Sequence, residues 1–128
     1  MSFRRRSPAA RILIGWVFAH MSFVIPVQRL RETSTLIAFY HPRPTYPVHI
    51  LLLPKRALAD VAALSPADVD FMLDLFAAVR SLVDELNLAP GGYRLITNGG
   101  PHQSVPQLHF HLVAGPPNPP EPRQTPAL

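Results

Sequence analysis

The chain has 128 residues, no cysteine and a net charge of +4. This length supports one domain with a hydrophobic core, and the lack of cysteine excludes disulfide scaffolds and cysteine-ligated zinc or iron–sulfur sites. An apolar fraction of 48% beside 16% charged residues is typical of a globular protein and excludes a disordered chain.

The positive charge is concentrated near the N-terminus. Six arginines precede the first acid, Glu32, whereas the remaining six basic residues face eight acids, so the rest of the chain sums to −2 (6 − 8). Because the body is close to neutral, we expect no dedicated nucleic-acid surface. The basic arm is expected to have only a weak attraction to phosphate or anionic lipid.

Residues 1–24 form this basic arm and an apolar run. Ile12, Trp16 and Phe23 recur at helical spacing, which favours an amphipathic helix packed on the domain or on a second subunit. A secretory signal or an anchor on a membrane surface is the alternative. Arg11 abuts the apolar run and no clear cleavage site follows, so we expect a cytoplasmic protein.

The middle of the chain predicts strands around one long helix. Ser65, Pro66 and Asp68 form a capping-box start, and we expect the helix to stop at Gly91 and Gly92. The expected apolar stripe of the helix is Val69, Met72, Leu73, Phe76, Val79, Leu82, Val83 and Leu86.

Four short apolar runs bounded by proline or glycine predict strands. A shorter helical segment is expected at 56–64, and a proline-rich loop at 41–47. The order of these elements predicts an α+β fold with an antiparallel sheet. The expected strands are 36–40, 48–53, 93–97 and 108–113.

Two histidines lie two residues apart in the last of these strands. Alternate residues of a strand share a face, so Gln107, His109 and His111 are expected to form one polar row. A row of imidazoles is costly to bury unless it is hydrogen-bonded or used, and imidazole is a nucleophile, an acid–base group and a metal ligand near neutral pH. We therefore place the function on this row, with a purely structural histidine pair as the alternative.

The segments around this row resemble the histidine triad (HIT) superfamily, whose signature is His-φ-His-φ-His-φ-φ with φ apolar. The matching stretch is Gln107 to Val113, preceded by Gln103-Ser104-Val105-Pro106. Three further segments resemble the family: Phe39-Tyr40-His41-Pro42, Pro47 to Lys55, and Gly92 to Asn98. The resemblance covers about residues 25–115 and is closest to the branch similar to nucleoside phosphoramidases and dinucleoside polyphosphate hydrolases.

The resemblance implies a fold and an assembly. The HIT-like fold has about five antiparallel strands, one long helix and a shorter one. Family members commonly pair as homodimers through the long helix and an edge strand, so we expect a homodimer. The domain is expected at 25–115, with the N-terminal arm at 1–24 and a proline-rich tail at 116–128.

The resemblance also implies the chemistry. A histidine attacks the α-phosphorus of a purine nucleotide derivative, and water or another acceptor resolves the covalent nucleotidyl-histidine; no metal or cofactor is needed. His109 takes the place of the nucleophile, His111 that of a phosphate ligand, and His49 is expected behind the nucleophile, holding its ring. The expected contacts to the nucleotide are Asn98, Gln103, Ser104, Phe39 and His41.

Three positions depart from the family pattern. Gln107 replaces the first histidine of the triad, which keeps hydrogen bonding and loses any proton relay. His41 replaces the acid that binds the ribose, and a neutral imidazole accepts one hydrogen bond where a carboxylate accepts several. His102 stands where a glycine is usual.

Two other functions fit the same residues. One is a nucleotide-binding or interaction module that kept the fold with weak or no catalysis. The other is a metal-binding protein that uses His109, His111 and either His49 or His102.

Overall fold

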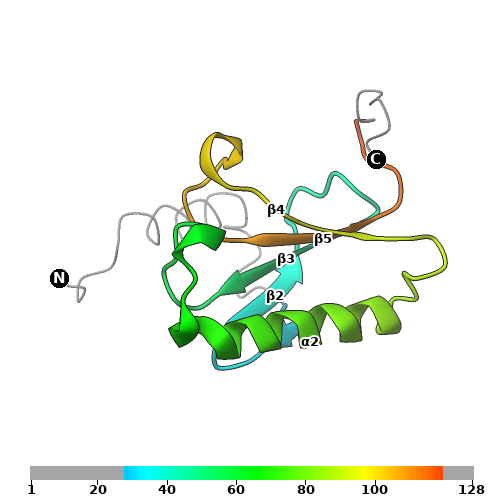
Figure 1. Ribbon diagram of the computed structural model, residues 1–128. Coiled ribbons are helices and arrows are strands. Elements are labelled where there is room, and N and C mark those ends of the chain that lie inside the picture. The colour runs from blue at the N-terminus through cyan, green and yellow to red at the C-terminus, as the bar shows by residue number, and fades with distance from the viewer. Residues whose placement is uncertain (1–27, 120–128) are drawn as a thin grey trace, which may run out of the picture.

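The computed structural model describes residues 28–119, which form a five-stranded antiparallel sheet with one long helix (Figure 1). The sheet order is β1-β2-β3-β5-β4, so the predicted fold is confirmed. The predicted helix of the N-terminal arm and most of the proline-rich tail lie outside the described residues. The strands are β1 Arg31–Glu32, β2 Leu36–Tyr40, β3 Val48–Pro54, β4 Arg94–Thr97 and β5 Phe110–Ala114.

The four longer strands confirm the sequence prediction to within about two residues, and the two-residue β1 was missed. β2 and β3 pair around the proline-rich loop 41–47. β5 lies between β3 and β4, so the last described strand is an interior strand of the sheet. The short helical segment expected at 56–64 is a single 3-10 turn, Val61–Ala63.

The long helix α2, Val69–Glu85, covers one face of the sheet (Figure 1). It follows a 3-10 turn, Pro66–Asp68, in which Ser65 and Asp68 form the predicted capping box. The predicted stop at Gly91 and Gly92 was wrong: Leu86 ends the helix and Asn87 has a φ of 53°. Asparagine tolerates this left-handed conformation, so it takes the role usually left to glycine.

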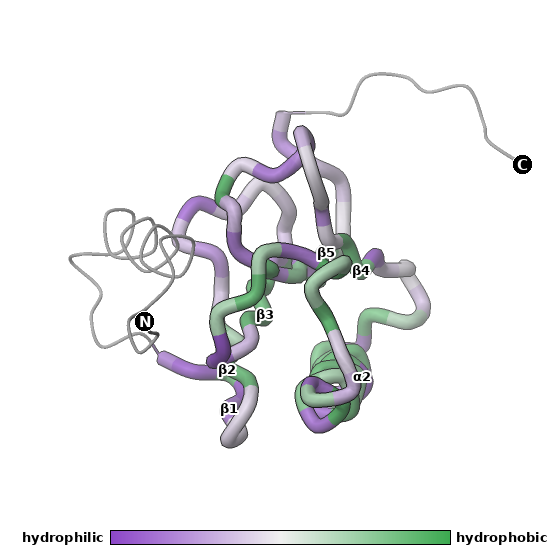
Figure 2. Tube along the Cα trace, turned by 60° about the vertical axis from the view of Figure 1, so that its left-hand side comes forward, coloured by the Kyte–Doolittle hydropathy of each residue, from purple (hydrophilic) through white to green (hydrophobic). Residues whose placement is uncertain are grey.

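The predicted apolar stripe of α2 was wrong in part. Leu73 is 66% exposed and Phe76 is 60% exposed. The helix carries two apolar faces with the same spacing, and periodicity alone does not say which one meets the sheet. Figure 2, in which α2 is seen nearly end-on beside the strands, shows that only one side of the helix faces them. The residues buried there are Phe71, Leu75, Ala78, Val79 and Leu82.

Side chains alternate between two faces of the sheet. The face under α2 carries the main core, which includes Leu36, Ile50, Leu52 and Leu112. The opposite face carries a smaller apolar cluster, which we call the second-face patch: Phe39, Leu51, Leu53 and Val105, with Ile37 packed against it. Within residues 28–119 no helix is long and apolar enough to cross a membrane.

Candidate active site

Four histidine rings lie side by side on the second face of the sheet. His49 is on β3 and His111 is on β5, while His109 just precedes β5 and His41 just follows β2. The ring centroids are 4.4 Å apart for His41 and His49, 5.2 Å for His49 and His111, and 5.1 Å for His111 and His109. The structure thus brings together the two histidines of the predicted row with two histidines from other segments.

Hydrogen bonds fix the tautomers of two of these rings. The backbone N–H of Thr45 donates to His49 Nδ1 at 3.1 Å, so the proton of neutral His49 is on Nε2. This nitrogen lies 2.9 Å from His111 Nδ1 and donates to it. Neutral His111 therefore carries its own proton on Nε2 and can donate from that nitrogen to a ligand.

The ring of His109 is oriented by a different partner. Its Nδ1 lies 2.7 Å from the backbone oxygen of Gln107, and because a carbonyl only accepts, Nδ1 carries the proton. The expectation that His49 holds the ring of His109 was wrong, since His49 bonds to His111. Of the two nitrogens of neutral His109, Nε2 has the lone pair, as a nucleophile requires.

The environment of the cluster disfavours positive charge. Burial, followed by the charges of His109, His49 and His41, lowers the pKa of His111 to about 3. Burial also lowers the pKa of His49 below its usual 6.5. Both rings are therefore neutral at physiological pH, which agrees with the tautomers that the hydrogen bonds require.

Gln107 contributes to the site through its backbone. It precedes β5 and is only 2% exposed. Its side-chain oxygen accepts from the N–H of Leu58 at 3.3 Å, and its amide nitrogen donates to the carbonyl of Arg56 at 3.5 Å. The side chain therefore anchors the segment after β3, and the backbone oxygen orients His109.

The other predicted phosphate contacts lie around the entrance to β5. Asn98 and Ser104 are exposed, and Asn98 follows the end of β4. The amide nitrogen of Gln103 donates to the carbonyl of Ala59 at 2.8 Å, which directs this nitrogen toward the loop before the helix. Thr97, which the sequence reasoning missed, donates to the backbone oxygen of His109 at 2.8 Å.

His41 stands at the end of β2 with a defined tautomer. The N–H of Arg43 donates to its Nδ1 at 2.9 Å, so the neutral ring carries its proton on Nε2. The single acceptor expected from the sequence is therefore already used by the backbone. The remaining ring nitrogen of neutral His41 is a donor, whereas a carboxylate at this position would be an acceptor.

The register of the strands places the second-face patch beside the histidines. Leu51 on β3 is paired with Phe39 on one side and with His111 on the other. Phe39 and Leu51 are only 3% and 0% exposed, so both side chains are covered in the structure. The role of Phe39 in lining a base pocket stays a prediction.

A cavity of about 520 Å³ lies where β4 begins and β5 ends, and no histidine lines it among the described residues. Val113 is among its lining residues and is 1% exposed; it shares a face with His111 and pairs with Arg94. Tyr46 forms one wall, and its ring meets His49 edge-on at a centroid distance of 5.5 Å. The remaining lining residues are Gly91, Gly92, Tyr93, Ala114, Gly115, Pro116 and Pro117.

The loop that carries Thr45 and Tyr46 is fastened to the segment after β5. The N–H of Asn118 donates to the carbonyl of Thr45 at 2.7 Å. Gly115 has a φ of +85°, and a Cβ there would lie 2.6 Å from Cγ of Pro47. Only glycine satisfies both the conformation and the close approach, so this contact holds the loop that sets the tautomer of His49.

Metal binding is not supported by the geometry. Within the described part of the chain, no group of three His, Asp or Glu side chains is placed to hold a metal ion. His102 is exposed on the 3-10 turn Gly100–His102, outside the histidine cluster. The ring nitrogens of His49 and His111 that face each other are joined by a hydrogen bond.

The sequence reasoning missed the backbone groups that orient the rings. A bond from a main-chain N–H leaves no mark on residue identity, so nothing in the sequence pointed to Thr45. The signal available for Tyr46 was an aromatic residue between prolines, two residues before the predicted strand that carries His49.

Comparisons with known proteins agree with this geometry. Residues 22–118 match the family model described as the HIT domain. An uncharacterized HIT-like protein of Helicobacter pylori is 31% identical over 93 residues, which cover 71% of this chain and 86% of that protein. An uncharacterized HIT-like protein of Azospirillum brasilense is 36% identical over 94 residues, covering 71% and 77%.

Solved structures of HIT proteins also superpose on this chain. A HIT family hydrolase from Clostridium thermocellum superposes with a TM-score of 0.66 and 33% identity, covering 77% of this chain and 89% of that one. A histidine triad nucleotide-binding protein from Candida albicans superposes with a TM-score of 0.67 and 26% identity, covering 88% and 83%.

Proposed function

This chain belongs to the HIT domain family, and we propose that it hydrolyses or transfers a nucleotidyl group through a covalent intermediate on His109. The substrate class is a purine nucleotide derivative with a leaving group on its α-phosphorus, such as a phosphoramidate, a nucleotidyl adduct or a dinucleoside polyphosphate. The observation that carries the proposal is the bond from His109 Nδ1 to the Gln107 carbonyl, because it puts the lone pair on Nε2. The hydrolase from Clostridium thermocellum among the similar structures supports the reaction class.

The proposed reaction has two displacements. First, Nε2 of His109 forms a bond to the α-phosphorus while the bond to the leaving group breaks, and the leaving group departs with the electron pair and takes a proton from solvent. The phosphorylated ring is cationic, with its Nδ1 proton held by the Gln107 carbonyl. Water then attacks the phosphorus, releases its proton to solvent and returns neutral His109 together with the nucleoside monophosphate.

His111 acts on the phosphoryl oxygens in this proposal. Its Nε2–H is a fixed donor, and a donor held in place stabilises the charge that develops on those oxygens. The exposed Asn98 and Ser104 supply further donors at the entrance to β5. The low pKa of His111 makes it a neutral donor at physiological pH when the nucleotide arrives.

The base would lie at the margin of the second-face patch, whose own side chains are buried. The Candida albicans protein that superposes on this chain is described as nucleotide-binding, which supports a nucleoside at this position. His41, with its donor on Nε2, would meet the sugar.

A nucleotide-binding module without turnover is the second candidate function. One observation favours it: the side chain of Gln107 is used by the backbone of Arg56 and Leu58, so nothing takes over the acid–base work of a first histidine. This module would bind nucleotide but form no adduct.

Mass spectrometry of the trapped intermediate separates the two functions. Brief incubation with adenosine 5′-phosphoramidate and rapid denaturation at neutral to alkaline pH should add one adenylyl group to His109. His109→Ala should lose the adduct and at least 99% of turnover while still binding AMP, whereas His102→Ala, at an exposed histidine outside the cluster, should keep both. Nucleotide binding without an adduct on any adenylate or guanylate donor would leave only the module.

A further inference from the structure

We propose that the segment after β5, residues 115–118, positions the hydrogen-bond donor of His111 from outside the histidine cluster. We call this segment the post-β5 strap. The strap fixes the backbone of Thr45, Thr45 fixes the proton of His49, and His49 in turn fixes the proton of His111. This inference rests on the proposed function, in which the Nε2–H of His111 binds the phosphoryl oxygens.

The hydrogen bond between His49 and His111 does not by itself decide which ring donates. It joins His49 Nε2 and His111 Nδ1 at 2.9 Å, and each neutral imidazole has one donor and one acceptor. If His49 donates, His111 keeps its proton on Nε2 and is a donor toward the phosphate. If both rings change tautomer, His111 donates to His49, and the His111 Nε2 becomes an acceptor that repels a phosphoryl oxygen.

A backbone N–H selects between these two states. The N–H of Thr45 lies 3.1 Å from His49 Nδ1 and can only donate, so it disfavours a proton on that nitrogen. The Thr45 hydroxyl is 3.4 Å from the same nitrogen, but a hydroxyl can donate or accept and therefore fits both states. The position of one main-chain group thus decides whether His111 presents a donor or an acceptor.

The strap holds this main-chain group at two points. The N–H of Asn118 donates to the Thr45 carbonyl at 2.7 Å, so both backbone groups of Thr45 are hydrogen-bonded. Gly115 lies against Pro47, two residues after Thr45, and a Cβ on Gly115 would meet Pro47 Cγ at 2.6 Å and Cδ at 2.9 Å. Real Cβ atoms essentially never come so close, so a side chain at position 115 would displace the loop.

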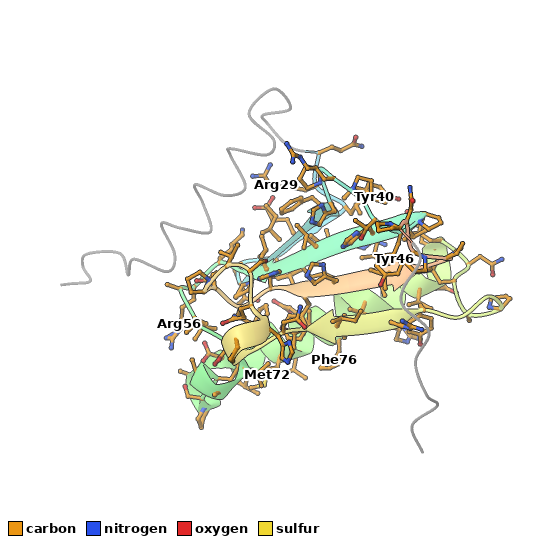
Figure 3. All side chains as sticks on the ribbon, turned by 90° about the horizontal axis from the view of Figure 1, so that it is seen from above. Arg29, Tyr40, Tyr46, Arg56, Met72 and Phe76 are labelled. Carbon is orange, nitrogen blue, oxygen red and sulfur yellow. The ribbon has the colours of Figure 1, made fainter. Side chains whose placement is uncertain are left out.

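The nucleophile is held from the other end of the sheet. Figure 3 shows Tyr46, which follows Thr45, at the opposite end of the sheet from Arg56. The side chain of Gln107 donates to the Arg56 carbonyl, and the carbonyl of Gln107 orients the ring of His109. A change in the strap should therefore leave the tautomer of His109 as it is, which gives the experiment an internal reference.

Nitrogen-15 NMR of the histidine rings in the full chain reads the tautomers directly, because protonated and unprotonated ring nitrogens have well-separated shifts. Wild type should carry the proton on Nε2 in His49 and His111, and on Nδ1 in His109. Gly115→Ala should move the two nitrogen shifts of His49 toward each other, and those of His111 likewise, because both rings then exchange between tautomers. The shifts of His109 should not change.

The same change should appear in catalysis. Gly115→Ala should lower kcat/KM for adenosine 5′-phosphoramidate at least fivefold, because a smaller fraction of the protein presents a donor to the phosphoryl oxygens. Asn118→Pro removes the N–H that binds Thr45 and should have the same two effects, on the tautomers and on kcat/KM. Gly92→Ala is the matched control: Gly92 has a φ of +88°, and a Cβ there would have no atom within 4 Å. It should keep the tautomers and stay within twofold in kcat/KM.

A double variant assigns the effect to the contact between the strap and the loop. Pro47→Ala removes the Cγ and Cδ atoms that a Cβ at position 115 would meet. Adding Pro47→Ala to Gly115→Ala should therefore return His49 and His111 to the wild-type tautomers. It should also raise kcat/KM at least threefold above that of Gly115→Ala alone.

The possible failures are distinguishable. Wild-type tautomers of His49 and His111 in both Gly115→Ala and Asn118→Pro would overturn the positioning role while leaving the proposed function standing, and so would an equal shift in Gly92→Ala. If Gly115→Ala does not fold, Asn118→Pro decides. Tautomers that respond as expected in a protein with no turnover and no adduct would overturn the proposed function, while the link from the strap to His111 would stand.

Discussion

The tautomers of His49 and His109 are each fixed by one hydrogen bond to the backbone. Thr45 supplies an N–H to His49, and Gln107 supplies a carbonyl to His109. These main-chain groups cannot exchange donor and acceptor roles, so each ring has one neutral tautomer. The site therefore depends on loop backbone at two points where the identity of the side chain is secondary.

The depressed pKa of His111 gives a testable pH dependence of stability. The folded protein holds His111 neutral down to about pH 3, whereas the unfolded chain protonates it below its usual 6.5. The unfolded state therefore binds more protons between these values, and stability falls as pH drops from about 6.5 toward 3. We expect wild type to lose about 2 kcal/mol more than His111→Asn between pH 7 and pH 5 in urea unfolding. Equal losses in the two proteins would contradict this.

Burial of the Gln107 amide gives a second prediction at this scale. Gln107→Leu keeps the size of the side chain but leaves the N–H of Leu58 without its acceptor, which should cost about 1–3 kcal/mol in chemical denaturation. Gln103→Leu, whose amide bonds in an exposed setting, is the control and should cost less than about 1 kcal/mol. Because the Gln107 carbonyl remains, the adduct on His109 should still form.

At the scale of the elements, α2 shows two apolar faces with different functions. One face meets the sheet through Phe71, Leu75 and Leu82. The other carries Leu73 and Phe76 into solvent. Exposed apolar faces of this kind are typical of protein interfaces.

The two faces can be compared with one substitution at matched positions. Leu75→Ala should lower the free energy of unfolding by about 2–5 kcal/mol, because Leu75 is 2% exposed and its removal leaves a cavity. Leu73→Ala should change it by no more than about 0.5 kcal/mol at high dilution. Both would be measured by urea unfolding at equal concentration, and similar losses would show that the assignment of the faces is wrong.

At the scale of the whole molecule, the exposed face of α2 and the edge of the sheet suggest one interface. Among the described strands, β4 is at one edge of the sheet, next to β5. An edge strand can pair with a strand of another chain. We propose that two copies meet through Leu73, Phe76 and β4, as the family resemblance implied. The side chains of the interface would then be provided by the half of α2 that the sheet leaves uncovered.

Light scattering after gel filtration tests this assembly. Wild type should elute with twice the mass of the 14.2 kDa chain, and Phe76→Lys should elute as a single chain because a buried lysine without a partner is costly. Val61→Lys changes a residue of 47% exposure outside α2 and should stay dimeric. A wild type of 14.2 kDa at micromolar concentration would refute the dimer.

The sequence was sufficient for the features that depend on local pattern. Alternation and proline punctuation located β2, β3, β4 and β5, and the Ser65 capping box located the start of α2. The end of α2 was misplaced because Asn87 took a conformation for which glycine was expected. The sheet-facing side of the helix was misassigned because Leu73 and Leu75 are equally apolar, and only tertiary packing distinguishes them.

The sequence predicted which histidines belong to the candidate site, but not which groups they form hydrogen bonds with. The motif around His109 and His111 and the resemblance for His49 and His41 predicted four histidines whose rings the structure brings together. The pairing of His49 with His111 depends on strand register, and the orientation of His109 depends on a carbonyl two residues earlier. Neither relation is recorded in the order of residue types.

The hydrogen bond from the Thr45 N–H to His49 blocks proton transfer through the hydrogen-bonded rings of His111 and His49 at the His49 end. A proton passed inward from His111 would have to leave at His49 Nδ1, where the backbone N–H of Thr45 blocks its exit. Protons transferred during turnover are therefore exchanged directly with solvent and do not pass through His49. With one transferring proton instead of a relay, the rate should vary linearly with the deuterium fraction of the water.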